Sequence, residues 1–103
     1  MKKGKAKIDI PYDKIQEFCR RWRIEEFAIF GSTLTDDFRP ESDVDVLVTF
    51  QRGAPWGLFE IVEMVEELKR IFGRNVDLVE KEALRNPFRR REILSQSQVV
   101  YAA

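Results

Sequence analysis

Apolar residues recur every three or four positions in two stretches of the chain, which is the spacing of one face of an α-helix. The first stretch opens with Pro11, which suits a first helical turn, and its apolar positions are Tyr12, Ile15, Phe18, Cys19 and Trp22. The second ends before Gly73, a residue type common just after a helix, and its apolar positions are Leu58, Ile61, Val62, Val65, Leu68 and Phe72. The pattern therefore predicts two amphipathic helices.

Short apolar runs outside these helices predict strands. Residues 27–30 form one run, residues 43–50 a second and residues 76–80 a third. Side chains in the second run alternate, so one face carries Val44, Val46, Val48 and Phe50, and the other carries Asp43, Asp45, Leu47 and Thr49. Residues 99–101 fit either a last edge strand or a tail docked on the core.

A third helix is predicted from Asn86-Pro87, with Asn86 as the cap and Pro87 in the first turn. The resulting order predicts a small α/β domain, with a sheet of about three to four strands covered by helices. The second and third strands are far enough apart in sequence for a helical crossover, which favours a parallel pair. The relative direction of the first two strands stays open. We expect a loose basic tail over residues 1–7 and one domain over residues 8–103.

Composition narrows the possible functions. The 103 residues have room for one domain, and 18 basic residues balance 18 acidic ones, which argues against direct nucleic-acid binding. With no histidine and one cysteine, Cys19, the chain lacks the residues for a tetrahedral zinc site, a Ser-His-Asp triad or an intrachain disulfide. No apolar run has the length of a membrane span or a signal peptide, so we expect a cytoplasmic protein.

Two aspartates interrupt the second predicted strand. Asp43 and Asp45 lie two residues apart, so their carboxylates share one face and repel each other unless a cation lies between them. Oxygen ligands of this kind suit Mg²⁺. An isolated Asp-Val-Asp more often lies at a solvated strand end, and that interpretation competes here. Asp77 interrupts the third strand, and if the two strands are neighbours it completes a cluster of three carboxylates that can hold two metal ions.

Gly31-Ser32 follows the first predicted strand. A strand that ends in this pair and opens a helix presents free backbone N–H groups, and glycine lets a phosphate approach closely. The pair is neither a Walker A loop nor a dinucleotide fingerprint. Taken alone, most such pairs are plain turns.

The combination of these elements is specific. Residues 30–48, FGSTLTDDFRPESDVDVLV, resemble the Gly-Ser plus Asp-x-Asp signature of the DNA polymerase beta-like nucleotidyltransferases. The short chain, the positions of Arg39 and Ser42, the run at 76–79 and Asn86-Pro87 are similar to the minimal nucleotidyltransferase branch. The resemblance implies a small nucleotidyltransferase-type domain with a short mixed sheet.

The resemblance also implies roles for particular residues. Asp43 and Asp45 would be metal ligands, and Asp77 the third carboxylate and a candidate base for the acceptor. The metal would be Mg²⁺, as two ions, with Mn²⁺ as a substitute. Gly31 and Ser32 would bind the β- and γ-phosphates of a nucleoside triphosphate. Arg39 would either contact phosphate or brace its loop, with the second role favoured.

The activity implied by the resemblance is transfer of AMP from ATP to a hydroxyl of a partner protein, with release of pyrophosphate. Single-domain members of this branch are commonly paired with HEPN proteins, many of them ribonuclease toxins, so a HEPN-type toxin is the expected partner. Two alternatives stay open. One is a non-catalytic antitoxin that neutralises its HEPN partner by occlusion. The other, favoured less, is an enzyme that acts on RNA ends or on a small molecule such as an aminoglycoside.

Some residues have no assigned role in this hypothesis. Arg89-Arg90-Arg91, with Arg85 nearby, could meet an acidic partner or nucleic acid, but a solvated helix face is favoured because charge runs usually are one. Trp56 and Phe59 could stack on a base, anchor a partner or pack locally. Cys19 lies on an apolar stripe, which indicates a packing role.

Overall fold

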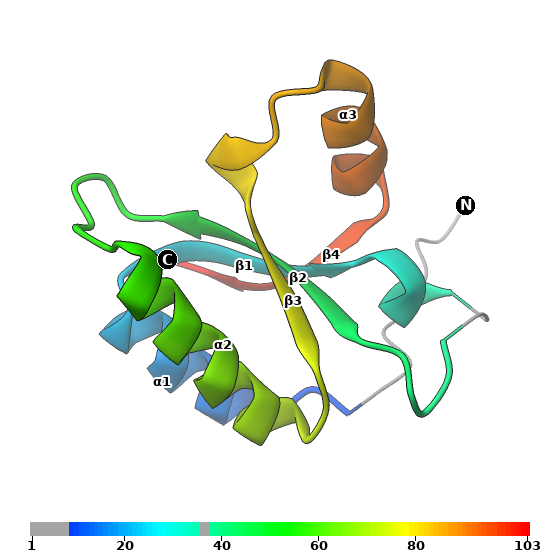
Figure 1. The fold of residues 1–103 in the computed structure, drawn as a ribbon, viewed down its shortest axis with the longest axis horizontal. Helices are drawn as coiled ribbons and strands as arrows, with labels where there is room; N and C mark the ends of the chain where they lie inside the picture. Colours follow the sequence, from blue (N-terminus) through cyan, green and yellow to red (C-terminus); the bar gives the residue numbers. More distant parts are fainter. Residues whose placement is uncertain (1–8, 36–37) are drawn as a thin grey trace.

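The structure is a computed structural model that describes residues 9–35 and 38–103; the tail predicted at residues 1–7 lies outside these ranges. Three α-helices and three strands follow one another in the predicted order, and residues 97–102 form a fourth strand at the sheet edge, one of the two alternatives left open for residues 99–101 (Figure 1). The elements are α1 (Tyr12–Arg21), β1 (Ile24–Phe30), the 3-10 turn η1 (Gly31–Leu34), β2 (Val44–Phe50), α2 (Leu58–Phe72), β3 (Val76–Glu80), the 3-10 turn η2 (Lys81–Ala83), α3 (Pro87–Ser95) and β4 (Ser97–Ala102).

The strands form one sheet in the order β3-β2-β1-β4. β2 and β3 are parallel, as predicted, and α2 makes the crossover between them. β1 is antiparallel to both β2 and β4, which settles the direction that the sequence left open. The predicted class, a small α/β domain with a short mixed sheet covered by helices, is confirmed.

Helices cover both faces of this sheet, and the alternation in β2 separates the two sides. Val44, Val46 and Val48 are at most 1% exposed and belong to the main core. That core also contains Ile15, Phe18 and Cys19 of α1 and Met64 and Leu68 of α2. Leu47 lies on the opposite face, in a smaller cluster with Ala28, Phe30 and Ile93 of α3. In Figure 1, α1 and α2 lie on one side of the sheet and α3 on the other. The face that carries Asp45 is therefore the α3 face.

The apolar stripe predicted for α2 is wrong in part. Leu58 and Val62 are 78% and 52% exposed, whereas Met64, outside the predicted stripe, is fully buried. The helix meets the core along a line that is rotated from the predicted one and consists of Ile61, Met64, Leu68, Ile71 and Phe72. Tyr12 is also exposed, at 55%, because it lies in the first turn of α1.

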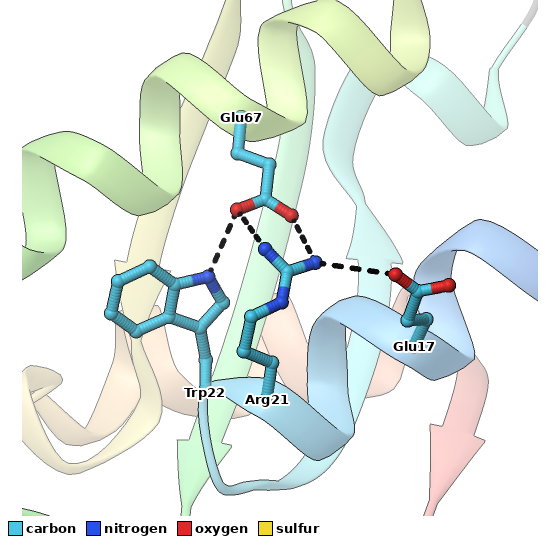
Figure 2. Close-up of polar contacts among 4 residues, drawn as sticks. All are labelled: Glu17, Arg21, Trp22 and Glu67. Atoms are coloured by element: carbon cyan, nitrogen blue, oxygen red, sulfur yellow. Dashed lines mark hydrogen bonds and ion pairs between the residues drawn. The ribbon is translucent and has the colours of Figure 1, made fainter.

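A polar cluster holds α1 against α2 (Figure 2). The Glu67 carboxylate accepts hydrogen bonds from Arg21 Nη1 at 2.8 Å and from Trp22 Nε1 at 3.1 Å. Arg21 Nη2 pairs with the second Glu67 oxygen at 2.6 Å and with Glu17 at 3.8 Å. Because the Glu67 side chain is only 16% exposed, its pair with Arg21 is less screened by solvent than an ordinary surface pair.

The helix ends predicted at Asn86 and Gly73 are confirmed, whereas Pro11 lies just before α1 and not in its first turn. Asn86 Oδ1 accepts hydrogen bonds from Phe88 N at 2.9 Å and Arg89 N at 3.2 Å, which caps α3. Gly73 ends α2 in the left-handed conformation, with a φ of 70°. None of the helices in the described part of the chain has the length and apolar character needed to cross a membrane.

Candidate functional site

The sheet brings the predicted aspartates to one end. In the parallel pair Asp45 lies opposite Asp77, and in the antiparallel pair it lies opposite Phe30, the last residue of β1. Asp43 lies one residue before the start of β2 and two residues before Asp45, which is inside the strand. The two aspartate-bearing strands are therefore neighbours, as the three-carboxylate hypothesis requires. Asp43 and Asp77 are exposed, and Asp45, between them, is half-buried.

Asp45 is the electrostatic centre of this group. Its pKa is raised above the ordinary value, mainly because burial disfavours the charged form, and further by the negative charges of Asp77 and Asp43. One interaction opposes this shift, because the backbone N–H of Ser32 donates a hydrogen bond to the Asp45 carboxylate. An ionised Asp45 thus carries a repulsion that a bound cation would relieve.

The turn after β1 lies directly against Asp45. Gly31 has a φ of 71°, and a Cβ at this position would collide with Asp45 Oδ2. Thr33 is fully buried, and its Oγ1 accepts a hydrogen bond from Asp45 N at 3.4 Å. Glycine is required here for two reasons: the left-handed backbone, and the close approach of a carboxylate. The Ser32 N–H, one of the donors predicted for phosphate, is engaged by Asp45.

The loop that leads to Asp43 is held by its own backbone and by Arg74. The hydroxyl of Ser42 accepts a hydrogen bond from Arg39 N at 3.0 Å, and Ser42 N donates to Arg39 O at 2.9 Å. From the turn before β3, Arg74 Nη1 donates to Arg39 O at 3.3 Å and Ser42 O at 3.4 Å. Its guanidinium lies 4.6 Å from the centre of the Phe38 ring.

Arg39 contributes to this bracing through its backbone. Its side chain is exposed and has no hydrogen bond or ion pair with any residue in the described ranges, which omit the neighbouring residues 36 and 37. A phosphate contact by Arg39 stays a prediction. Arg74 could not be identified from the sequence, because a basic residue before a strand does not reveal which carbonyl groups it reaches.

Metal binding stays a prediction for the three aspartates. Within residues 9–35 and 38–103, no three acidic or cysteine side chains are arranged so that they could hold a metal ion on their own. The chemistry of the donor set nevertheless suits Mg²⁺, which binds through one or two carboxylates and takes its remaining ligands from substrate phosphates and water. The mutual repulsion at Asp45 fits the same requirement.

Among the described residues, pockets lie at different ends of the sheet. A pocket of about 210 Å³ lies between the end of β1 and α3, beside the aspartates, and is lined by Phe30, Gly31, Arg89, Glu92, Ile93 and Gln96. A larger one, of about 450 Å³, lies at the opposite end of β2, around Phe50 and Trp56. The smaller pocket is the one that matters here, because it shares Gly31 with the site.

Trp56 packs locally rather than in the candidate site. Its Nε1 donates a hydrogen bond to Trp22 O at 2.7 Å, and the centres of the two indole rings are 5.2 Å apart. Phe59 is 82% exposed. Cys19 is fully buried, which confirms its packing role.

A comparison with known families identifies the class of this fold and site. The nucleotidyltransferase domain family matches residues 13–100, so the chain belongs to that family. The protein adenylyltransferase MntA of Thermococcus cleftensis is similar to this chain, with 35% identity over 71 residues, which are 69% of this chain and 70% of the relative.

Solved structures show the same fold at lower identity. A toxin–antitoxin crystal structure with AMP-PNP contains a chain with a TM-score of 0.73 and 18% identity, covering 91% of this chain and 75% of that one. A complex of a tri-AMPylated Shewanella oneidensis HEPN toxin with its MNT antitoxin gives a TM-score of 0.63 at 17% identity, covering 89% of this chain and 70% of that one.

Proposed function

We propose that this chain is a Mg²⁺-dependent nucleotidyltransferase that transfers AMP from ATP to a hydroxyl of a HEPN-type partner protein. The observation that carries the proposal is the position of Asp45, which lies opposite Asp77 in the parallel strand pair and against Gly31 in the turn after β1. The chain that holds this arrangement belongs to the nucleotidyltransferase family. The adenylyltransferase relative and the solved complex with an AMPylated HEPN toxin support the choice of AMP and of the acceptor. The cytoplasmic location expected from the sequence is part of this proposal.

The reaction follows from what each residue would hold. Gly31 and Ser32 bind the β- and γ-phosphates of ATP through the turn's remaining N–H groups and the Ser32 hydroxyl. Asp43, Asp45 and Asp77 would provide the carboxylates that hold two Mg²⁺ ions, and these ions would supply neutralisation of phosphate charge and activation of the attacking oxygen. The acceptor oxygen forms a bond to the α-phosphorus. The bond between the α-phosphorus and the oxygen that bridges it to the β-phosphate breaks, and pyrophosphate leaves. Asp77 accepts the proton of the hydroxyl. Positioning and electrostatics supply most of the rate.

One observation favours a second function, a non-catalytic antitoxin. The aspartates do not form a ready metal site among the described residues, and Ser32 N–H is already used by Asp45. A chain that only occludes its partner needs neither. The first function is preferred because burial and the neighbouring charges of Asp77 and Asp43 make an ionised Asp45 destabilising to the fold unless a cation is bound.

The test uses a HEPN-type protein as the acceptor, the class that the proposal names. The partner is incubated with ATP, Mg²⁺ and either the wild-type chain or the double variant Asp43→Asn, Asp45→Asn, and its intact mass is measured. The wild type should add AMP-sized mass, while the variant should lose orders of magnitude in rate and stay folded. Growth rescue from the toxin is scored in parallel. If the variant rescues growth as well as the wild type, the occlusion mechanism is correct.

A further inference from the structure

One face of α3 lines the pocket beside Gly31. The lining residues Glu92 and Ile93 lie three and four positions after Arg89, which is the spacing of a single helical face, and Gln96, the residue that follows α3, lines the pocket beside them. Phe30 and Ile93, both largely buried, supply its apolar part. At about 210 Å³, the pocket is smaller than the roughly 300–1,000 Å³ typical of sites for a whole small molecule. It therefore suits one part of a nucleotide.

The three consecutive arginines of α3 have different surroundings. Arg90 is half-buried, and its Nη1 donates a hydrogen bond to Lys81 O at 3.0 Å, so it ties α3 to η2. Arg91 is exposed and does not line the pocket. Arg89 is the one cationic residue among the described residues that line the pocket, and within the described ranges its guanidinium has no ion-pair partner.

The position of the pocket selects the part of the nucleotide that would occupy it. Gly31 both lines the pocket and opens the turn to which the proposed function assigns phosphate binding. A group in this pocket is therefore continuous with the phosphate chain. A guanidinium presents a planar fork of donors that matches two phosphate oxygens, and such charge-assisted bonds are about twice as strong as neutral ones.

We propose that Arg89 is a phosphate-binding residue and that this pocket is the subsite for the terminal phosphates of the triphosphate, which leave as pyrophosphate. The inference rests on the proposed function and deepens it. Glu92 lies on the same face of α3, one turn beyond Arg89, and its negative charge weakens the subsite. The balance lets the subsite hold the triphosphate and still release the product.

Calorimetric titration of the 103-residue chain with inorganic tripolyphosphate and with ATP, both with Mg²⁺, tests the proposal. Arg89→Ala should weaken the binding of both ligands by a similar factor, about 10- to 100-fold, as expected for loss of hydrogen bonds to a charged group. Arg91→Ala is the matched control, with the same charge change on the same helix, and should shift each affinity less than about threefold. Arg89→Lys, which keeps the charge and loses the fork, should be intermediate. Glu92→Gln should tighten tripolyphosphate binding.

Several results would overturn the proposal. Equal effects of Arg89→Ala and Arg91→Ala would reduce Arg89 to general surface charge. Loss of ATP binding with tripolyphosphate binding intact would assign the pocket to the nucleoside, as would weaker ATP binding by Glu92→Gln. If the wild type binds neither ligand, the proposed function fails together with the inference, whereas normal wild-type binding with no effect of Arg89→Ala contradicts the inference alone.

Discussion

The contact between Gly31 and Asp45 makes the substitution Gly31→Ala a quantitative test of the site. Alanine at a φ of 71° costs about 1–2 kcal/mol, because the left-handed conformation brings Cβ close to the carbonyl oxygen. The new Cβ also collides with the Asp45 carboxylate, and forcing an extra carbon into a packed position costs about 1–3 kcal/mol. We expect the free energy of unfolding to fall by about 2–5 kcal/mol in total.

Gly73 provides the matched control for this change. Its φ of 70° is nearly the same, but nothing lies within 4 Å of an added Cβ, so Gly73→Ala carries the backbone cost alone. The difference between the two variants, measured by urea unfolding followed by circular dichroism, isolates the collision with Asp45. In an Asp45→Ala background the collision is removed, and Gly31→Ala should cost no more than Gly73→Ala. Equal costs in the wild-type background, or an unchanged cost without the Asp45 carboxylate, would refute the reasoning.

Three further expectations concern Cys19, Arg74 and Asp45. Burial raises the pKa of the Cys19 thiol from 9.0 to about 12, so the thiol should resist alkylation at pH 8 in the native chain but not in urea. For the same reason the free energy of unfolding should fall as the pH rises from 9 towards 12. Rapid alkylation of the native chain would contradict this. Arg74→Ala should lower the free energy of unfolding by about 1 kcal/mol and weaken Mg²⁺–ATP binding by loosening the loop before Asp43, unlike the exposed control Arg70→Ala. Because the pKa of Asp45 is raised, its ionisation lowers the free energy of unfolding as the pH rises. The Asp45→Asn variant should therefore have a higher melting temperature than the wild type at neutral pH and the same one in acid. A lower melting temperature of the variant at neutral pH would contradict this.

Local pattern was sufficient for most elements but not for their limits. The strand over 76–80 and the helix cap at Asn86 are determined by residues that are close in sequence, and both match the prediction. β1 begins at Ile24, three residues before the predicted run at 27–30. The pattern did not predict this start because Glu25 and Glu26 separate Ile24 from the apolar run. Glu26 is tolerated in the strand because it is half-exposed and lies 3.8 Å from Lys81 Nζ.

Contacts between distant segments could not be derived from local pattern. The sequence predicts two aspartate-bearing strands, but only the register shows that Asp45 faces Asp77. Similarly, Gly31 looks like an ordinary turn glycine until the Asp45 carboxylate is found against it. The stripe of α2 failed for a related reason, since the orientation of a helix on the sheet decides whether Leu58 or Met64 is buried.

The most direct measurement asks which phosphorus of ATP reaches the acceptor. The HEPN partner is incubated with the wild-type chain, Mg²⁺ and ATP that is radiolabelled at either the α- or the γ-phosphate, and the protein band is counted after denaturing electrophoresis. Nucleotidyl transfer places α-label on the partner, leaves γ-label in pyrophosphate, and is abolished by a chelator and by the double variant Asp43→Asn, Asp45→Asn. Transfer of γ-label would mean a kinase reaction, and transfer of neither label would contradict the enzymatic account.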